Sequence, residues 1–320
     1  MKVLIAEDDR VSRRLLEVTL DKWGYELIVC KDGLAAWESL QKPDAPRLAI
    51  LDWMMPGKDG VRLCREIRAR SGHPYVYVIL LTSRNSRDDM IMGLDAGADD
   101  YLSKPFDQRE LELRLRTGRR ILDLQSELIS AREALRIQAT HDSLTGIWNR
   151  SAILETLENE LSRAQRQGLS LAAIITDLDH FKKINDTYGH TVGDAVLREA
   201  ARRMRAAMRP YDGLGRYGGE EFLIVAPGCD TGNGLLVAER LRLAITNEPI
   251  LTPEVDLSIS ASFGLAALSG SHSIDTDNLI SAADEALYRA KSAGRNRIEA
   301  ATLLEIAGRS NGTPDVRRVC

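Results

Sequence analysis

Apolar and polar positions follow a regular pattern through the first third of the chain. Five short segments rich in Val, Ile and Leu have the length and composition of strands. They cover residues 2–6, 26–30, 47–51, 76–81 and 100–103. Between them, apolar residues recur at helical spacing, as in residues 12–20. Repeated strand–helix units of this length predict an α/β domain over residues 1–106, built on a doubly wound, five-stranded parallel sheet.

From residue 107 onward the apolar spacing is that of one long helix. A stripe with alternating intervals of three and four residues is typical of a coiled-coil seam. It consists of Ile121, Leu124, Leu128, Ala131 and Leu135. We expect a helical coiled-coil linker over residues 107–140 that forms a homodimer. The alternative is an amphipathic helix that packs against its own domain.

Length and composition narrow the protein class. A chain of 320 residues allows two domains with a core each, and its 28% charged and 44% hydrophobic residues are those of an ordinary soluble protein. A net charge of −4 gives no reason to expect nucleic-acid binding, and no apolar run is long enough to span a membrane. The strand-like segment at residues 2–6 leaves no room for a signal peptide, and the four cysteines lack metal-ligand spacing. We therefore expect a cytoplasmic protein, with a disordered tail over residues 301–320.

Polar residues follow the strands of the predicted parallel sheet. Glu7 and Asp8 come after the first strand and Asp52 after the third, while Thr82 follows the fourth and Lys104 the fifth. The carboxyl ends of parallel strands meet at one edge, where three carboxylates repel one another unless a divalent cation neutralises them. The hydroxyl and the ammonium group could then bind a phosphoryl group added to the central acid.

This set of residues resembles the receiver domain of two-component response regulators. The resemblance implies that Asp52 is the phosphoacceptor and that a cognate histidine kinase or phosphotransfer protein is a partner. One Mg²⁺ is expected on four residues: Glu7, Asp8, Asp52 and, by its backbone carbonyl, Met54. Three positions match the switch residues of the family: Thr82, Tyr101 and Lys104. The family more often has Asp where Glu7 stands, so this ligand is one methylene longer.

A second apolar stripe on the linker suggests a hypothesis for signalling. Leu115, Leu122 and Ile129 lie one residue further round the helix than the coiled-coil seam. Phosphorylation of Asp52 would change which stripe pairs in the homodimer and so rotate the downstream domains. Gly118 interrupts the helical pattern and predicts a bend.

Two glycines and two glutamates form one tight bend at residues 218–221, directly before the apolar segment 222–226. Paired glycines between strands predict a hairpin turn because they accept a positive φ, and their missing side chains leave room for a ligand. A second apolar segment, 171–176, ends in Asp177. If the two strands are neighbours, these carboxylates could hold a hard cation, which commonly brings phosphates with it.

Residues 141–300 resemble a GGDEF domain, the family of diguanylate cyclases that join two GTP molecules into cyclic di-GMP. The resemblance is carried by the bend, by the upstream segment 177–190, and by residues 141–150 and 291–297 at the two ends. It implies an α+β domain similar to the nucleotidyl cyclases. It also implies GTP as the substrate and Mg²⁺ as the cofactor, with two ions in each active site.

The resemblance assigns the catalytic positions. Asp177, the backbone carbonyl of Leu178 and Glu220 are expected to hold Mg²⁺. Lys182 would stabilise the charge that develops on the phosphates. Both Glu220 and Glu221 are placed to take the proton of the attacking hydroxyl, and the sequence does not divide these roles.

Further positions match nucleotide-binding residues of the family. Lys291 and Arg295, four residues apart on one expected helix face, would bind the terminal phosphates. Asn185 and Asp194 match the pair that reads guanine, since a carboxylate can accept hydrogen bonds from donors that adenine lacks on that edge. Phe181 is expected to touch the nucleotide.

Arg209 and Asp212 lie upstream of the bend at the offset of the product-inhibition site of the family. Arg240 and Arg163 match arginines that complete this site from a neighbouring domain. We therefore expect a dimeric cyclase that phosphorylation of Asp52 activates through dimer rearrangement and that cyclic di-GMP inhibits. Two alternatives stay open: a catalytically inactive GGDEF domain that binds GTP or cyclic di-GMP, and a receiver that acts mainly through a partner protein.

Overall fold

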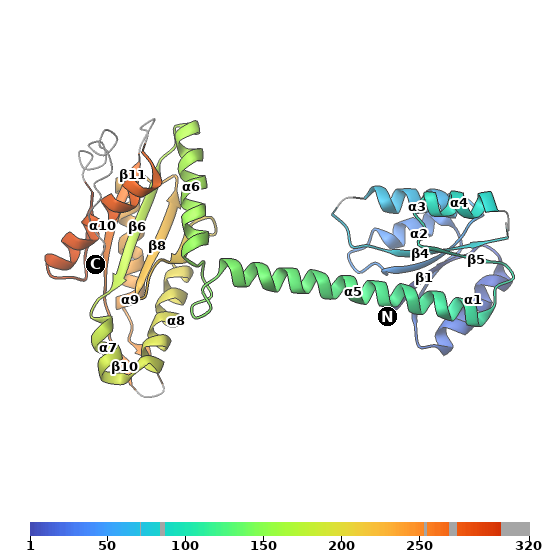
Figure 1. Cartoon of the computed structure of the whole chain (residues 1–320), viewed down its shortest axis with the longest axis horizontal. Helices are drawn as coiled ribbons and strands as arrows, with labels where there is room; N and C mark the ends of the chain where they lie inside the picture. Colours follow the sequence, from blue (N-terminus) through green and yellow to red (C-terminus); the bar gives the residue numbers. More distant parts are fainter. Residues whose placement is uncertain (71, 84–86, 253–254, 269–273, 302–320) are drawn as a thin grey trace. The chain divides into compact units, whose positions relative to one another are not determined.

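The computed structural model describes residues 1–70, 72–83, 87–252, 255–268 and 274–301. Two compact units, Met1–Glu133 and Ala134–Cys320, divide the chain and are described one at a time (Figure 1). The tail predicted at residues 301–320 lies outside the described residues from position 302 onward.

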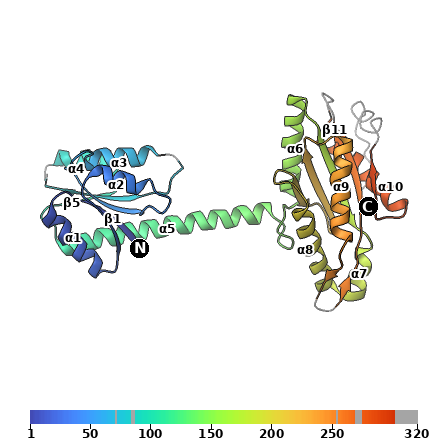
Figure 2. The same cartoon turned by 180° about the vertical axis from the view of Figure 1, so that it is seen from behind.

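The first unit has the α/β fold that the strand–helix alternation predicts. Its five-stranded parallel sheet has the order β2-β1-β3-β4-β5. The strands are β1 (Lys2–Ala6), β2 (Glu26–Cys30), β3 (Leu48–Asp52), β4 (Tyr77–Thr82) and β5 (Asp100–Ser103). The connecting helices are α1 (Arg10–Lys22), α2 (Gly33–Leu40), α3 (Gly60–Ala69) and α4 (Arg87–Asp95). Helices cover both faces of the sheet, and this explains why its central strands are apolar on both sides (Figures 1 and 2).

Helix α5 (Gln108–Thr140) follows the last strand and runs without interruption for 33 residues. The long helix predicted from residue 107 is confirmed, but the bend predicted at Gly118 is wrong. A Cβ at this position would lie 2.5 Å from the ring of Tyr77. Glycine is therefore needed here because the helix approaches the sheet closely, and the helix itself stays regular.

The two apolar stripes of α5 lie in different surroundings. Leu115 and Leu122 are buried in the core between α1, α5 and the sheet. Four residues of the coiled-coil seam are 41–69% exposed: Ile121, Leu124, Leu128 and Leu135. Ile129, the third residue of the second stripe, is 59% exposed, so Leu115 and Leu122 are the two that would have to leave the core for the stripes to exchange partners. The exchange itself stays a hypothesis.

The contact between the first unit and α5 continues beyond this core. Arg47, which precedes β3, donates from Nη2 to Gln125 Oε1 at 2.8 Å and from Nη1 to Ser126 Oγ at 2.9 Å. Near the start of the helix, Arg114 contacts Asp100 Oδ1 at 2.7 Å. Side-chain contacts thus fasten α5 to the first unit over three to four turns.

The second unit has an α+β fold, as expected. Its five-stranded sheet has the order β12-β11-β6-β8-β7, with antiparallel neighbours except for β11 and β12. The strands are β6 (Leu171–Leu178), β7 (Gly213–Arg216), β8 (Glu221–Pro227), β11 (Ala261–Leu268) and β12 (Ile298–Ala300). A separate ribbon pairs β9 (Ile250–Leu251) with β10 (Asp256–Leu257).

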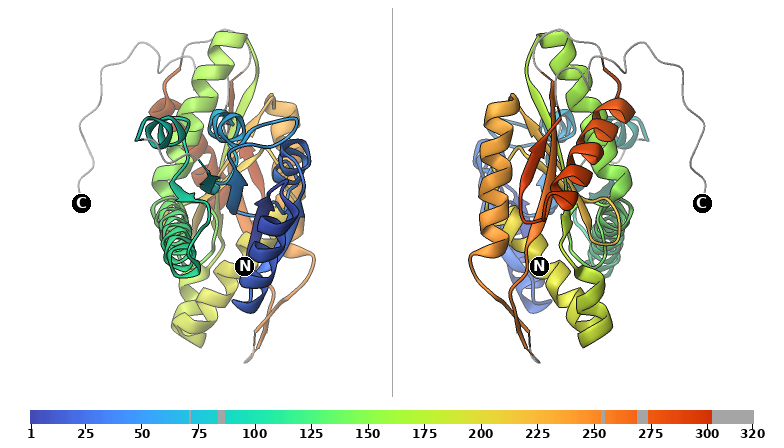
Figure 3. Two further views of the ribbon diagram at one scale, coloured as in Figure 1. Left: turned by 90° about the vertical axis from the view of Figure 1, so that its right-hand side faces the viewer. Right: turned by 90° about the vertical axis from the view of Figure 1, so that its left-hand side faces the viewer.

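Two layers of helices enclose this sheet. One face packs against α7 (Phe181–Tyr188), α8 (His190–Ala206) and α9 (Thr231–Thr246). The other face packs against α6 (Arg150–Gln167) and α10 (Thr276–Ser292). Figure 3 shows α9 in orange and α10 in red on opposite sides of the sheet. The strand ends that carry Asp177 and the hairpin glutamates emerge from between these layers.

Candidate functional site

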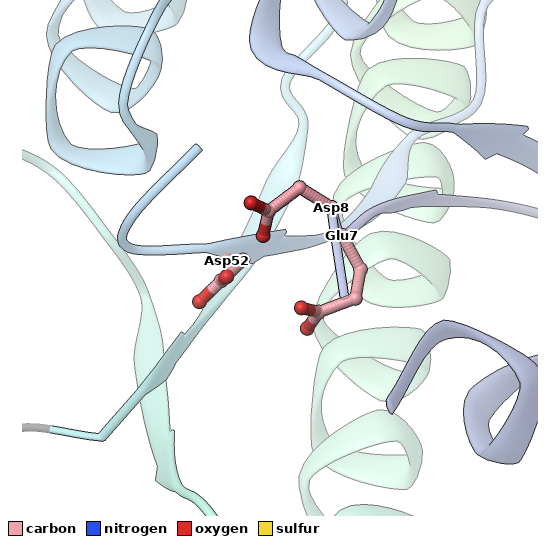
Figure 4. A group of neighbouring side chains, drawn as sticks. All are labelled: Glu7, Asp8 and Asp52. Carbon is pink, nitrogen blue, oxygen red and sulfur yellow. The ribbon is translucent and has the colours of Figure 1, made fainter. Parts of the chain in front are cut away.

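An acid cluster lies at the carboxyl edge of the parallel sheet (Figure 4). Glu7 and Asp8 follow β1 and Asp52 ends β3, and one carboxylate oxygen from each lies within 4.8 Å of the other two. Glu7 and Asp52 are buried, whereas Asp8 is exposed. Across the described ranges, this is the one carboxylate group with such spacing. Three hard oxygen donors so close together fit a divalent cation such as Mg²⁺.

Lys104 reaches the acid cluster from the segment after β5. Its Nζ lies 2.7 Å from Glu7 Oε2 and 2.9 Å from Asp52 Oδ1. Burial raises the pKa of Glu7; the bond from Lys104 opposes the shift, and the charge of Asp52 adds to it. For Lys104, burial lowers the pKa, but the bonds to the two acids outweigh burial and the pKa is raised. The lysine is thus held as a cation between the two buried carboxylates.

The other predicted receiver residues lie around this cluster on the same edge. Thr82 is buried at the end of β4, and Met54 is 60% exposed shortly after β3. Tyr101 is half-buried in β5, with the Arg114 guanidinium 5.9 Å from its ring centroid. Sequence reasoning missed Arg114, which connects α5 to the predicted switch strand.

In the second unit, the predicted strands are neighbours. β6 pairs antiparallel with β8, and Asp177 lies opposite Glu221. The Leu178 N–H donates to the carbonyl of Glu220 at 3.3 Å. Burial raises the pKa of Asp177, Glu220 and Glu221, and the charge of Asp177 raises the pKa of both glutamates further. The structure therefore brings three acids together with little positive charge to compensate them.

Lys291 supplies part of that compensation, because its Nζ lies 2.7 Å from Asp177 Oδ2. Glu220 and Glu221 form no ion pair with another residue in the described ranges. A divalent cation would lower the pKa of all three acids. Their carboxylates do not come within 4.8 Å of one another as those of the receiver cluster do, so the residues offer oxygen donors for Mg²⁺ without forming a converged set.

The hairpin glycines are needed for a reason other than the one expected. Neither Gly218 nor Gly219 has a φ in the left-handed region, so the prediction of positive φ is wrong. A Cβ at Gly218 would lie 2.6 Å from Glu221 Oε2, so the missing side chain makes room for this carboxylate. No atom lies within 4 Å of a Cβ at Gly219, and this position is open to a ligand as predicted.

The predicted base-reading residues lie on α7 and α8. Asn185 Oδ1 lies 1.9 Å from the point that a Cβ on Gly193 would occupy, so the Asn185 side chain rests on this glycine beside Asp194. Phe181 is buried and its ring borders the same glycine. Lys182 is exposed on α7. The structure thus brings the Asn185 side chain against Gly193, the residue before Asp194, and the missing side chain of Gly193 permits this approach.

The two predicted phosphate-binding cations do not share a helix face. Helix α10 ends at Ser292, and Arg295 lies in the following loop with a left-handed φ of 62°. That part of the prediction is wrong, because the chain turns before Arg295 could continue the helix. The guanidinium still lies close enough to Asp177 to lower its pKa. Lys291 is therefore positioned by a helix and Arg295 by a loop.

The predicted product-inhibition residues occupy a turn between α8 and β7. Asp212 is buried, with Oδ2 accepting the Arg209 N–H at 3.0 Å and Oδ1 without a hydrogen-bond partner in the described part of the chain. Burial raises the pKa of Cys229, and the charges of Arg209, Asp212 and Arg240 act on the same thiol, which places Arg240 near this turn. Arg163, on α6, lines a neighbouring cavity of about 310 Å³. An unsatisfied buried carboxylate oxygen is a feature that a polar ligand would satisfy.

One polar connection behind the hairpin was missed by sequence reasoning. Arg216 donates from Nη1 to both carboxylate oxygens of Asp142 at 3.2 Å, and from Nη2 to the carbonyl of Gly219 at 2.8 Å. The partners are separated by 74 residues. The first turn of the second unit and the glutamate hairpin are therefore joined through one guanidinium.

Comparison with known proteins assigns both units. Residues 3–116 match the family model of the response regulator receiver domain, and residues 139–297 match that of the diguanylate cyclase GGDEF domain. The response regulator PleD of Caulobacter vibrioides is 34% identical over 258 residues, which are 78% of this chain and 56% of PleD. The diguanylate cyclase DgcP of Pseudomonas aeruginosa is 43% identical over 169 residues, which are 53% of this chain and 25% of DgcP. The chain thus spans about half the length of PleD and a quarter of DgcP.

Solved structures resemble the second unit together with its preceding helix. The coiled coil and GGDEF domain of DgcB from Caulobacter crescentus, in complex with c-di-GMP, aligns with a TM-score of 0.53 and 30% identity, covering 60% of this chain and 99% of that one. The diguanylate cyclase SiaD from Pseudomonas aeruginosa, in complex with its activator SiaC, aligns with a TM-score of 0.50 and 36% identity, covering 60% and 74%. None of the helices in the described ranges combines the length and the apolar character that a bilayer span requires.

Proposed function

The chain is a response regulator with a receiver domain and a C-terminal GGDEF domain, and we propose that it condenses two GTP molecules into cyclic di-GMP and two pyrophosphates. The meeting of Asp177 with Glu220 and Glu221 beside Lys291 carries the proposal. A module that bound only cyclic di-GMP would have no need of three acids at one strand end, whereas a module that bound GTP with Mg²⁺ would keep them, so synthesis itself must be measured.

The reaction joins the 3′-hydroxyl of one GTP to the α-phosphorus of another. Asp177, Glu220 and the Leu178 carbonyl would hold Mg²⁺, which when bound offsets the triphosphate charge and polarises the bond to the departing pyrophosphate. With Glu220 as a metal ligand, we assign Glu221, which follows it directly and lies opposite Asp177, to accept the proton of the hydroxyl.

The remaining polar residues would hold the nucleotide. Lys182, Lys291 and Arg295 would bind phosphate oxygens, and Asn185 with Asp194 would read the guanine edge. Since one domain offers one such half-site, two copies must face each other for a bond to form. Their mutual orientation then supplies a large part of the rate, because well-oriented intramolecular reactions reach effective molarities of about 10⁵ M or more.

The proposed dimer forms through the exposed seam of α5, from Ile121 to Leu135. Apolar side chains at 41–69% exposure on a long helix lose this contact with water when they pair with the same stripe of a second copy. The DgcB structure similarly contains a coiled coil next to its GGDEF domain.

Regulation is proposed at both ends of the chain. A histidine kinase or phosphotransfer protein would phosphorylate Asp52 with Mg²⁺ bound at the acid cluster, and the new charge would compete with Glu7 for Lys104. The contact of Arg114 with Asp100 and Tyr101 would carry the change into α5 and the dimer. Cyclic di-GMP would inhibit by binding at Arg209 and Asp212, together with Arg240 and Arg163.

One assay tests the proposal. The purified chain is incubated with GTP and Mg²⁺, with and without beryllofluoride as a phosphoryl mimic, and cyclic di-GMP is measured by chromatography. We expect synthesis in both conditions and a rise of about 10-fold with the mimic. Asp52→Asn should keep the basal rate and lose the response. A folded protein that binds GTP but makes no cyclic di-GMP in either condition would favour the binding module.

A further inference from the structure

Asp179 follows the strand that carries Asp177, but its carboxylate accepts hydrogen bonds from within the protein. The residue is buried, with an exposed fraction of 5%. Its Oδ1 accepts the Ser262 hydroxyl at 2.7 Å, and its Oδ2 accepts the Ser260 hydroxyl at 2.6 Å and the Asn296 backbone N–H at 3.0 Å. Three donors already satisfy this carboxylate, so it has no need of a metal ion.

The third donor belongs to the loop between α10 and β12, and this loop has an unusual backbone. Arg295 and Asn296 both have left-handed φ values, 62° and 49°. Side chains other than glycine rarely adopt this conformation, and asparagine tolerates it better than arginine does, so Arg295 is the more strained of the two. Two in succession persist only when surrounding contacts hold them.

The end of this loop is tied to β11, because the Phe263 N–H donates to the carbonyl of Arg297 at 2.9 Å. The Arg295 N–H donates to the carbonyl of Ala290 at 3.1 Å, which only ties the loop to its own helix. Arg242 donates to Asn296 Oδ1 at 2.8 Å from the exposed side. The bond from the Asn296 N–H to Asp179 is the one that connects the loop directly to the end of β6.

The position of this loop matters because Arg295 is part of it. Lys291 is fixed by α10 and contacts Asp177, whereas the direction of Arg295 is set by the two left-handed residues. The Arg295 charge acts on Asp177 from this loop. A change in the bond between Asp179 and Asn296 would therefore act on the loop that carries Arg295.

We propose that Asp179 is a positioning residue, which holds the loop 294–297 so that Arg295 faces the triphosphate bound at Asp177. The inference rests on the proposed function, because it requires that this site binds a nucleoside triphosphate. In this role Asp179 contacts neither substrate nor metal, and it affects nucleotide binding only through the position of Arg295.

A double-mutant cycle on nucleotide affinity tests this inference. The probe is 3′-deoxy-GTP with Mg²⁺, which lacks the attacking hydroxyl and so remains unreacted during calorimetric titration. We expect Asp179→Asn and Arg295→Ala each to weaken binding by about 10-fold, and the double variant to be no weaker than Arg295→Ala within about 2-fold. If the two substitutions act independently, the double variant should bind the probe about 100-fold more weakly than wild type, and this result would overturn the inference.

Two further variants separate positioning from general stability. Ser262→Ala removes the donor to the other oxygen, so it should lower the melting temperature but keep probe affinity within about 2-fold of wild type. Asn296→Gly, added to Asp179→Asn, should restore affinity at least in part, because glycine adopts a positive φ without support. Equal loss of affinity in Ser262→Ala, or no recovery with glycine, would count against a role through the loop.

The outcomes also separate this inference from the proposed function. If the wild-type chain does not bind 3′-deoxy-GTP with Mg²⁺, the proposed function fails. If the wild type binds and Asp179→Asn binds equally well, only the positioning role fails. Should Asp179→Asn not fold, Ser260→Ala removes one donor from the same oxygen, and its loss of affinity should likewise vanish in an Arg295→Ala background.

Discussion

The two acid sites of this chain are built in different ways. In the receiver, the parallel strands bring Glu7, Asp8 and Asp52 to one edge with oxygens within 4.8 Å, and Lys104 contacts two of the three. In the GGDEF domain, antiparallel pairing sets Asp177 opposite Glu221, and Lys291 contacts Asp177. The receiver site has its three carboxylates close together and the Lys104 ammonium group in contact with two of them. The acids of the GGDEF site have most of their negative charge uncompensated.

This difference suggests how one domain can control the other. The receiver site is complete within a single chain, so phosphorylation of Asp52 needs no second copy. Under the proposed function, the GGDEF site is a half-site that needs a divalent cation, a nucleotide and a second copy of the chain. Association of the two copies can then regulate it without any change in the residues of the site. The following predictions break or sharpen this contrast.

The largest effect is expected for Glu220→Gln. The change removes a proposed Mg²⁺ ligand and one negative charge, so cyclic di-GMP synthesis should fall by about 10³-fold or more, as measured by chromatography. Phosphorylation of the receiver by a small phosphodonor should be unaffected, since its acid cluster is complete without the cyclase. Glu239→Gln, which removes an acid paired with Arg242 on α9, is the control. Synthesis within about 10-fold of wild type in Glu220→Gln would contradict the assignment.

The next largest effect is expected for a charge placed on the exposed seam of α5, compared with a charge placed on its buried face. Leu128 is 69% exposed and Leu122 is 3% exposed. Leu128→Glu should yield monomers in light scattering and lower synthesis by about 10-fold or more at low protein concentration, with an unchanged melting temperature. Leu122→Glu should instead lower the melting temperature of the receiver, because it places a charge in the core. A Leu128→Glu variant that remains a fully active dimer would argue against the exposed seam as the interface.

A smaller effect is expected for Gly193→Ala. The added methyl group would lie 1.9 Å from Asn185 Oδ1 and must displace this side chain. We expect the KM for GTP to rise by about 10-fold with a smaller change in kcat, because binding and not chemistry is disturbed. Gly232→Ala on α9, where the nearest atom is 3.6 Å away, is the matched control. Equal KM values in the two variants would refute the role of Asn185 beside Asp194.

The smallest effect is a pH dependence. The folded-state pKa values of Asp177, Glu220 and Glu221 are raised. These acids therefore contribute stability below their unfolded pKa values, and that contribution is lost as the pH rises through the folded values. Mg²⁺ with 3′-deoxy-GTP prefers the deprotonated acids, so the rise in melting temperature that it causes should shrink as the pH falls.

The ligand-induced rise in melting temperature should begin to shrink at a pH above the ordinary carboxylate pKa of about 4, because the folded-state pKa values are raised. Glu221→Gln, which cannot titrate at this position, should show a flatter profile than wild type when melting temperatures are recorded from about pH 7.5 to about pH 5. Identical profiles in the two proteins would mean that Glu221 does not titrate with the site.

The elements that sequence reasoning predicted well are those with strong apolar periodicity. The receiver strands and the long helix after residue 107 stand out because buried strands are apolar throughout and long helices repeat every three to four residues. Asp177 could be located because it directly follows such a segment, and the hairpin glutamates because they directly precede one. Where a polar residue ends a recognisable strand, its place in the fold follows from that strand.

The errors concern features that depend on what packs against the backbone. Gly118 could not be told from a helix break, because its neighbour Tyr77 is distant in the sequence. The helical spacing of Lys291 and Arg295 hid the turn between them, although Gly294, with its positive φ of 115°, is the kind of residue that ends a helix. A contact at Asp179 supports this turn. The burial of Leu115 and Leu122 was not foreseen for the same reason, since these two residues of the second stripe face a core formed by other elements.

The attachment of α5 to the receiver has a practical consequence for building chimeric regulators. A receiver excised at residue 106 would lose Leu111, Leu115 and Leu122 from its interior, and Arg47 would lose its partners at Gln125 and Ser126. Exchange of sensory modules should therefore transfer the helix through residue 126 with the donor receiver. A fusion made further along, between residues 127 and 133, leaves both hydrophobic interiors intact and adjusts only the phase of the helix that joins them.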